Sequence, residues 1–186
     1  MAQEDKERWN KKYIKKEKIP EKPIDLIKTY EVLSPGKQAL DIACGLGRHS
    51  KYLASKAYKV DALDISSVAI SELQELKNIH PKEVDFDSYL LPKEKYDLII
   101  CVYFLKRSLF TQMIDALKPN GIILMETFLH SINNERAPSN PAFLLNEGEL
   151  EVFFNDRCEL LHIHKYEDID YQGYKTMKTQ MVARKK

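Results

Sequence analysis

The chain has 186 residues, of which 44% are hydrophobic and 31% are charged, so it can bury one sizeable core and is too apolar to be disordered. Its 29 lysines and arginines balance 28 aspartates and glutamates, which excludes an overall field that would attract nucleic acid or acidic lipid. Three widely spaced cysteines and the lack of a long apolar run predict a cytoplasmic protein with neither a disulfide framework nor a membrane span.

The first 35 residues predict two helices. A polar helix is expected over residues 3–17, and prolines then interrupt the chain before a second helix at about 24–33. The turn at residues 34–36, which reads Ser-Pro-Gly, ends this helical segment.

From residue 36 onward, short apolar runs alternate with amphipathic segments. Seven strands are predicted, at 38–43, 58–63, a short run ending near 84, 96–102, 122–128, 158–166 and 175–183. Helices are expected after 48, after the capping residue Ser66, and at 107–117 and 147–154. This order predicts an α/β fold, a mostly parallel seven-stranded sheet with helices on both faces and a C-terminal antiparallel hairpin. One domain over residues 1–186 is expected.

The chemistry-bearing motif lies where the first strand becomes a helix. Residues 41–48 read Asp-Ile-Ala-Cys-Gly-Leu-Gly-Arg, and small residues at this place let a ligand approach the backbone of a doubly wound sheet. A glycine pair also serves plain tight turns, so the motif alone leaves both interpretations open. Asp64 follows Gly47 at nearly the spacing at which an acidic residue meets a ribose hydroxyl, which favours an adenosine-type ligand.

Two residues argue against a dinucleotide such as NAD. Ser50 stands where a dinucleotide fingerprint has its third glycine. Asp41, inside the first turn, would repel a pyrophosphate but would suit the ammonium of an amino-acid group. The pattern therefore favours S-adenosylmethionine.

The run from Leu40 to Gly47 resembles the first motif of class I S-adenosylmethionine-dependent methyltransferases, which have a Rossmann-like fold. Residues 60–64, 85–86, 96–100 and 117–121 resemble the later motifs in the same order. Trp9 with Tyr13, and the segments 85–92, 126–128 and 138–150, are similar to the tellurite-resistance-type branch of that family. The chain departs from the pattern mildly, with Ala43 and Asn120 at usual glycine positions.

The resemblance implies a site for the cofactor S-adenosylmethionine at the carboxyl edge of the sheet. The loop after the first strand would line the methionine part, Asp64 would hold the ribose, and residues 65, 85 and 86 would contact the adenine. Residues 1–35 would form a helical lid over a Rossmann-like core at 36–186. The expected cofactor-binding residues are Trp9, Tyr13, Asp41, Ala43, Cys44, Gly45, Gly47, Asp64, Ile65, Asp85, Phe86 and Cys101.

The predicted reaction is in-line methyl transfer to a small-molecule acceptor, such as a thiol or a tellurite- or selenite-type oxyanion. Such a displacement asks mainly for positioning and exclusion of water. Candidates for positioning the acceptor are Tyr103, Arg107, His130 and Arg136. Methylation of nucleic acid or protein, and a regulator that binds the cofactor without turnover, are the alternatives.

Other reactive residue types suggest no further chemistry. Cys44 and Cys101 are expected to be small core residues rather than nucleophiles. His162 and His164 share a strand face, but no third ligand is visible at a suitable spacing, so no metal site is predicted.

Overall fold

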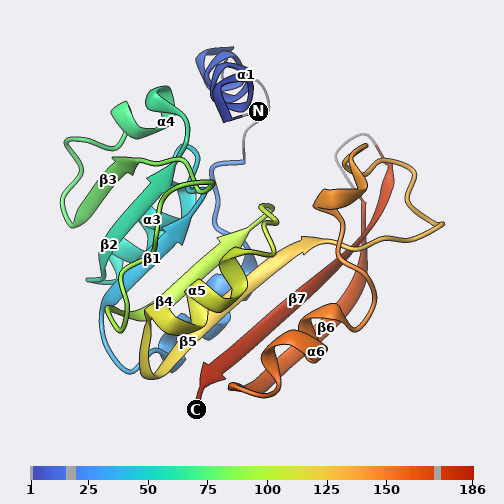
Figure 1. Ribbon diagram of the computed structural model, residues 1–186. Helices are drawn as coiled ribbons and strands as arrows, with labels where there is room; N and C mark the ends of the chain where they lie inside the picture. The colour runs from blue at the N-terminus through green and yellow to red at the C-terminus, as the bar shows by residue number, and fades with distance from the viewer. Residues whose placement is uncertain (1, 16–19, 170–172) are drawn as a thin grey trace.

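A seven-stranded sheet forms the centre of the computed structural model, which describes residues 2–15, 20–169 and 173–186 (Figure 1). The strand order is β3-β2-β1-β4-β5-β7-β6. Neighbours among the first five strands pair in parallel, whereas β7 pairs antiparallel with both β5 and β6. The strands are β1 (Gln38–Ile42), β2 (Lys59–Asp64), β3 (Ile79–Glu83), β4 (Tyr96–Val102), β5 (Leu117–Phe128), β6 (Cys158–Ile169) and β7 (Lys175–Lys185).

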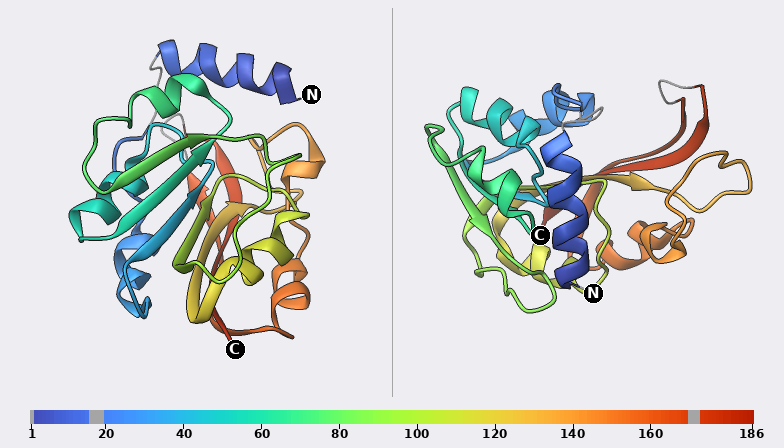
Figure 2. Two further views of the ribbon diagram at one scale, coloured as in Figure 1. Left: turned by 60° about the vertical axis from the view of Figure 1, so that its left-hand side comes forward. Right: turned by 90° about the horizontal axis from the view of Figure 1, so that it is seen from above.

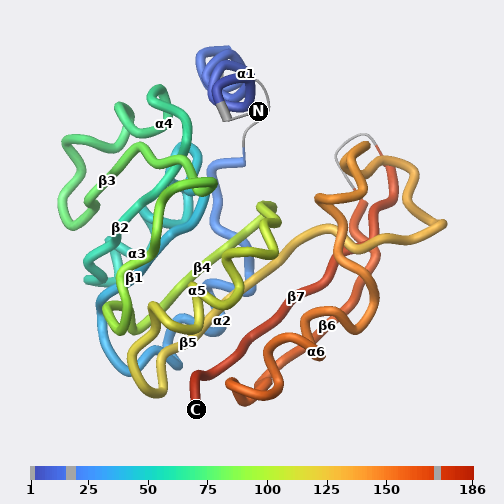
Figure 3. Tube along the Cα trace, viewed as in Figure 1, coloured from blue at the N-terminus to red at the C-terminus, as the bar shows by residue number. Residues whose placement is uncertain are grey.

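Helices cover both faces of this sheet. On one face lie α2 (Asp25–Tyr30) and α3 (Arg48–Ser55), behind the sheet in the view of Figure 3. On the other lie α5 (Leu109–Ala116) and α6 (Glu149–Phe154). The sequence-based fold class is therefore confirmed: a Rossmann-like, mostly parallel sheet with helices on both faces and a C-terminal antiparallel hairpin.

The apolar strand β4 organises both cores. All of its residues are buried, as a central parallel strand covered on both faces requires. Leu98 and Ile100 belong to the core under α2 and α3, whereas Ile99 and Cys101 belong to the core under α5 and α6. Alternate side chains of a strand point to opposite faces, so one apolar run holds both helical layers to the sheet.

Several element boundaries differ from the sequence-based prediction. The second N-terminal helix is divided into α2 and a 3-10 turn at Glu31–Leu33. The helix capped by Ser66, α4 (Ser67–Ser71), ends after five residues, and the Ser66 hydroxyl accepts the Ala69 N–H as expected of a cap. The turn expected at 118–121 lies within β5, where Asn120 has a φ of 62° and the pairing with β4 shifts register.

The N-terminal helix α1 (Ala2–Lys15) lies across the carboxyl ends of the parallel strands, beside α4 (Figure 2). The helix predicted over 3–17 is confirmed as far as residue 15, and residues 16 and 17 lie outside the described residues. Neither α1 nor any other helix among the described residues combines the length and the apolar character of a membrane span.

A buried tyrosine fastens the segment after α2 to the sheet. The Tyr58 hydroxyl, which is inaccessible to solvent, donates to the Glu31 carbonyl oxygen at 2.7 Å and lies 2.9 Å from the Glu31 carboxylate. Burial raises the pKa of the Tyr58 phenol, with Glu31 adding to the effect, so the hydroxyl keeps its proton and donates.

We expect Tyr58→Phe to lower the free energy of unfolding by about 0.5–1.5 kcal/mol, because it removes a buried hydrogen bond. The Glu31 carbonyl oxygen keeps the Ser34 N–H, and the Glu31 carboxylate keeps Lys37. Urea unfolding followed by circular dichroism measures the change, with an unaltered m-value as the sign of an intact native state. The matched control is Tyr52→Phe on α3, expected to change stability by less than about 0.5 kcal/mol. Equal effects of the two substitutions would contradict the anchoring role of Tyr58.

Candidate functional site

The loop after β1 has a backbone that demands small residues. Ala43, Gly45 and Gly47 have φ angles of 55°, 53° and 74°, in the left-handed region that glycine adopts without strain. A Cβ on Gly45 would lie 2.8 Å from the Tyr13 hydroxyl. Glycine at this position therefore serves both the turn and the close approach of α1.

Two carboxylates flank this loop, and both are buried. Asp41 accepts the Ser50 hydroxyl proton at 2.6 Å. Asp64 accepts the Gly45 N–H and the Ser66 N–H, each at 2.8 Å. Asp64 thus ties the carboxyl end of β2 to the loop after β1.

Burial raises the pKa of both acids. For Asp41 the pKa rises to about 7, mainly by burial, with the Ser50 hydrogen bond opposing the shift and Asp64 adding to it. The pKa of Asp64 is also raised by burial, against the hydrogen bonds from Ser66 and Gly45. A cationic group placed beside Asp41 would restore the charge that burial disfavours.

Helix α1 covers the loop. Tyr13 is buried, and Trp9 stacks on it with ring centroids 5.6 Å apart. Asn10 adds a contact that the sequence did not reveal: its side-chain carbonyl accepts the Ser66 hydroxyl at 2.6 Å, and its amide lies 3.2 Å from the Ser67 hydroxyl. The helix is therefore fastened beside the ends of β1 and β2, where a lid is expected.

The remaining predicted cofactor residues line the same edge of the sheet. Ile65 follows β2 and is partly exposed. The Asp85 carboxylate accepts the Asp87 N–H at 2.8 Å, and Phe86 packs against Phe104 with centroids 5.5 Å apart. Whether these residues contact adenine stays a prediction.

The two cysteines at this edge are buried free thiols. Cys101 donates its S–H to the Phe104 carbonyl at 3.3 Å, and burial raises the pKa of its thiol to about 12. Burial likewise raises the pKa of Cys44 well above the ordinary value. Neither is a ready thiolate, which supports their interpretation as small packing residues.

Three of the four predicted acceptor-positioning residues lie on the outer segments beyond β4 and β5. The guanidinium of Arg107 is engaged with the Glu149 carboxylate and donates to the carbonyls of residues 142 and 144, each at 2.9 Å. His130 is exposed, and Arg136 lies over the Tyr174 ring at 5.6 Å. Arg107 therefore binds the segment before α6 through its hydrogen bonds to these carbonyl oxygens.

The fourth residue, Tyr103, lines a cavity of about 560 Å³ at the carboxyl end of β5. Its walls come from the segment leading into α2 and from β5, β7 and β6. Besides Tyr103, the lining residues are Lys22, Pro23, Ile24, Asp25, Lys28, Glu126, His164, Tyr166, Asp168 and Gln180.

Glu126, Gln180 and Tyr166 line this cavity and were not among the predicted site residues, although Glu126 belongs to a segment that resembles the family. Gln180 donates to the Glu126 carboxylate at 2.7 Å, and Lys178 donates to the Tyr103 hydroxyl at 3.0 Å. The Glu126 carboxylate inside the apolar run of β5 was the one sequence feature that indicated a buried polar group here. Its partners could not be found, because they lie on strands that the sheet brings together from far along the chain.

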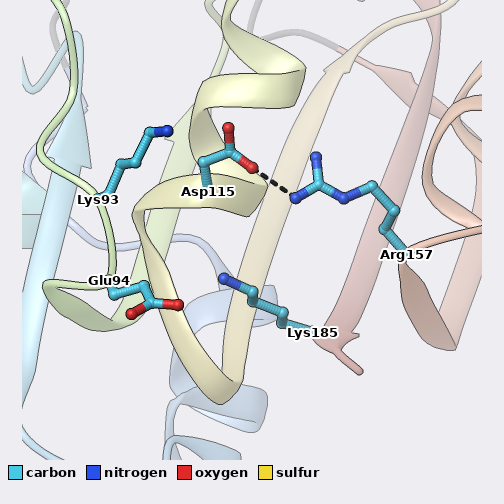
Figure 4. Close-up of a pocket in the computed structure, with 5 residues that line it drawn as sticks. All are labelled: Lys93, Glu94, Asp115, Arg157 and Lys185. Atoms are coloured by element: carbon cyan, nitrogen blue, oxygen red, sulfur yellow. Dashed lines mark hydrogen bonds and ion pairs between the residues drawn. The ribbon is translucent and has the colours of Figure 1, made fainter.

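A second hollow, of about 550 Å³, lies at the opposite end of the sheet (Figure 4). Its lining is wholly charged, and Arg157 is paired with Asp115. It lies far from the glycine loop, near the amino ends of β4 and β5. We therefore place the candidate functional site at the carboxyl edge.

Comparison with known proteins identifies the family of this chain. The family model described as tellurite resistance protein TehB matches residues 2–178. A curated relative from Haemophilus influenzae, named probable S-adenosyl-L-methionine-dependent methyltransferase TehB, is 28% identical over 144 residues, covering 71% of this chain and 49% of the relative. The chain spans about half the length of the curated relatives that it matches.

Solved structures share the fold. The crystal structure of TehB from Haemophilus influenzae superposes with a TM-score of 0.77 and 26% identity, covering 96% of this chain and 67% of that one. A structure from Methanosarcina mazei, described as a S-adenosylmethionine-dependent methyltransferase, gives a TM-score of 0.68 at 21% identity, covering 88% of this chain and 98% of that one. The second likeness concerns the fold alone.

We expect the stability of the protein relative to Asp41→Asn to fall as the pH rises from about 4 to about 7. The pKa of Asp41 is raised to about 7 in the folded state, so its favourable contribution is present below the ordinary pKa and is lost as the pH rises through the raised one. Urea unfolding of both proteins between pH 5 and pH 8 measures the difference.

The control is Asp87→Asn, because Lys106 lowers the pKa of the Asp87 carboxyl. Its contribution is present above the ordinary pKa and lost only as the pH falls below it, so this control should show no trend between pH 5 and pH 8. A flat difference for Asp41→Asn would contradict the raised pKa.

Proposed function

The chain belongs to the tellurite resistance protein TehB family, and on this premise we propose that it is a S-adenosylmethionine-dependent methyltransferase acting on a small-molecule acceptor. One observation carries the proposal. A glycine loop with left-handed backbone lies between the buried carboxylates of Asp41 and Asp64, under the Tyr13 hydroxyl of a covering helix.

The residues present fit this cofactor chemically. Its amino-acid end carries an ammonium, which Asp41 would hold, because a cation offsets the cost of burying that carboxylate. The small residues Ala43, Gly45 and Gly47 allow close approach to the backbone. Asp64 already accepts the N–H groups of Gly45 and Ser66, and its carboxylate would also accept hydrogen bonds from ribose hydroxyls.

When bound, the cofactor supplies an activated methyl group and its own leaving group. The protein then has to orient the acceptor and exclude water. We propose that the described part of residues 1–35 forms the lid of a single domain whose core is 36–186, with Trp9 and Tyr13 of α1 closing over the loop. The partly buried stack of these two rings supports that role.

The alternatives differ in what they require. A nicotinamide dinucleotide would bring a pyrophosphate toward Asp41, where like charge opposes it. A macromolecular acceptor would require a basic stripe beside the carboxyl edge. A regulator without turnover would keep the cofactor loop but would release no S-adenosylhomocysteine. The cytoplasmic location and the thiol or oxyanion acceptor stay predictions.

Calorimetric titration with S-adenosylmethionine and S-adenosylhomocysteine tests the cofactor site, with NAD as the unrelated nucleotide. We expect both sulfur compounds to bind and Asp64→Ala to weaken them by about tenfold or more, as the loss of hydrogen bonds to a charged group implies. The matched control is Asp61→Asn, on the same strand but paired with Lys95, which should change the affinity less than about twofold.

Binding of NAD in preference to S-adenosylhomocysteine, or equal effects of the two substitutions, would contradict the proposed cofactor site. Release of S-adenosylhomocysteine with thiols, selenite or tellurite as added acceptors separates a methyltransferase from a regulator. A protein that binds the cofactor tightly and shows no turnover with any acceptor class would favour the regulator.

A further inference from the structure

An asparagine on α1 reaches the beginning of α4, which lies beside it (Figure 2). The side-chain oxygen of Asn10 accepts the Ser66 hydroxyl at 2.6 Å and the Val68 N–H at 3.4 Å. Its amide donates to the Ser67 hydroxyl at 3.2 Å. Asn10 is partly buried, and its partners are more than 50 residues away along the chain. One side chain therefore joins the N-terminal helix to the connection that follows β2.

The hydrogen bonds of this contact fit one another in direction. The Ser66 hydroxyl accepts the Ala69 N–H at 3.2 Å, so its own proton goes to the oxygen of Asn10. The Asn10 NH₂ group then faces the Ser67 hydroxyl. The position requires an accepting oxygen on a short side chain, with a donor beside it, and alanine has neither.

The contact is anchored at a rigid point of the cofactor edge. Ser66 is inaccessible to solvent, and its N–H donates to the Asp64 carboxylate at 2.8 Å. The same carboxylate accepts the Gly45 N–H of the loop after β1. Ser66 thus connects Asn10 of α1 to the acid that is proposed to hold the ribose.

The next turn of α1 covers the loop. Tyr13 lies three residues after Asn10, so both side chains leave the same face of the helix. Tyr13 is buried, and a Cβ on Gly45 would lie 2.8 Å from its hydroxyl. Burial, with the charge of Asp64 as the next cause, raises the pKa of the Tyr13 phenol, which keeps its proton. A ligand on the loop therefore lies beneath Tyr13 and leaves when α1 moves away.

A second polar contact of α1 is weaker by its setting. Lys6 forms an ion pair with Glu83 at the end of β3, between side chains that stay partly exposed. Water and salt screen such pairs, so they contribute little to holding two elements together. The hydrogen bonds of Asn10, which are partly buried, hold α1 more firmly.

We propose that Asn10 is a positioning residue that latches α1 over the cofactor loop and thereby sets how fast the cofactor enters and leaves. The inference rests on the proposed methyltransferase function and adds the control of access to its cofactor site. The latch consists of protein groups alone, so it holds the lid in the free and in the bound protein alike. Its loss speeds both binding and release and leaves the affinity nearly unchanged.

Stopped-flow binding of S-adenosylhomocysteine measures both rate constants. Trp9 is the single tryptophan of the chain and stacks on Tyr13, so its fluorescence reports on the lid directly. Asn10→Ala should raise the rate constants of binding and release about tenfold each, which corresponds to about 1.4 kcal/mol and lies within the range of two hydrogen bonds. Acrylamide should also quench Trp9 more strongly in this variant, because α1 spends more time away from the loop.

Three further variants separate the latch from a general loss of structure. Asn10→Asp keeps the accepting oxygen and should stay within about threefold of the unaltered protein. Ser67→Ala removes the partner of the amide and should raise both rate constants about threefold. In the Asn10→Ala background it should add nothing, because the two groups act as a pair. The matched control on the same helix is Lys6→Ala, expected to change either rate constant less than about twofold.

The affinity distinguishes a latch from a cofactor contact. Faster release with unchanged binding in Asn10→Ala would make Asn10 a residue that touches the cofactor, and the latch would be wrong. Unchanged rate constants in Asn10→Ala, or equal effects of Asn10→Ala and Lys6→Ala, would also overturn it.

Two results separate this inference from the function on which it rests. If the unaltered protein does not bind S-adenosylhomocysteine, the cofactor assignment fails, whereas quenching of Trp9 in the free protein still tests whether Asn10 holds α1. If S-adenosylhomocysteine binds and Asn10→Ala exchanges it at the ordinary rate, the latch alone fails.

Discussion

Two hydrogen bonds from backbone N–H groups to Asp64 hold the functional edge together. The N–H of Gly45 belongs to the loop after β1, and that of Ser66 begins the segment that leads into α4. Both oxygens of one buried carboxylate are therefore engaged with two connections that leave neighbouring strands. Hydrogen bonds to a charged group are worth more than neutral ones, so these two bonds hold the glycine loop firmly against the carboxyl end of β2.

Burying two carboxylates, Asp41 and Asp64, beside one loop costs free energy, because burial disfavours the charged form of each. Asp64 lies close enough to Asp41 to raise the pKa of Asp41 by charge repulsion, in addition to the larger effect of burial. A merely structural turn would not need a second buried acid beside the first. A positively charged ligand placed beside this acid pair would gain more binding free energy than at the surface, because it would offset the cost of burying the carboxylates.

The sheet could be predicted from the sequence because its signals are local. The predicted limits of β4 coincide with Tyr96–Val102, since a continuous apolar run shows both its length and its burial. The glycine loop and Asp64 were found for the same reason. The start of β5 was misplaced because Pro119, Asn120 and Gly121 read as a turn, although the backbone there continues within the strand.

The polar groups beyond β4 could not be predicted in the same way, because they meet only through the fold. Arg107 was predicted to position the acceptor, but its guanidinium is engaged by Glu149 and by carbonyl oxygens of the segment before α6. Glu126 and Gln180 are 54 residues apart and meet only because β7 pairs antiparallel with β5. The C-terminal hairpin therefore brings the Gln180 amide to the Glu126 carboxylate at the carboxyl end of β5. A parallel β7 would have presented another residue to Glu126, because the antiparallel register with β5 is what sets Gln180 opposite it.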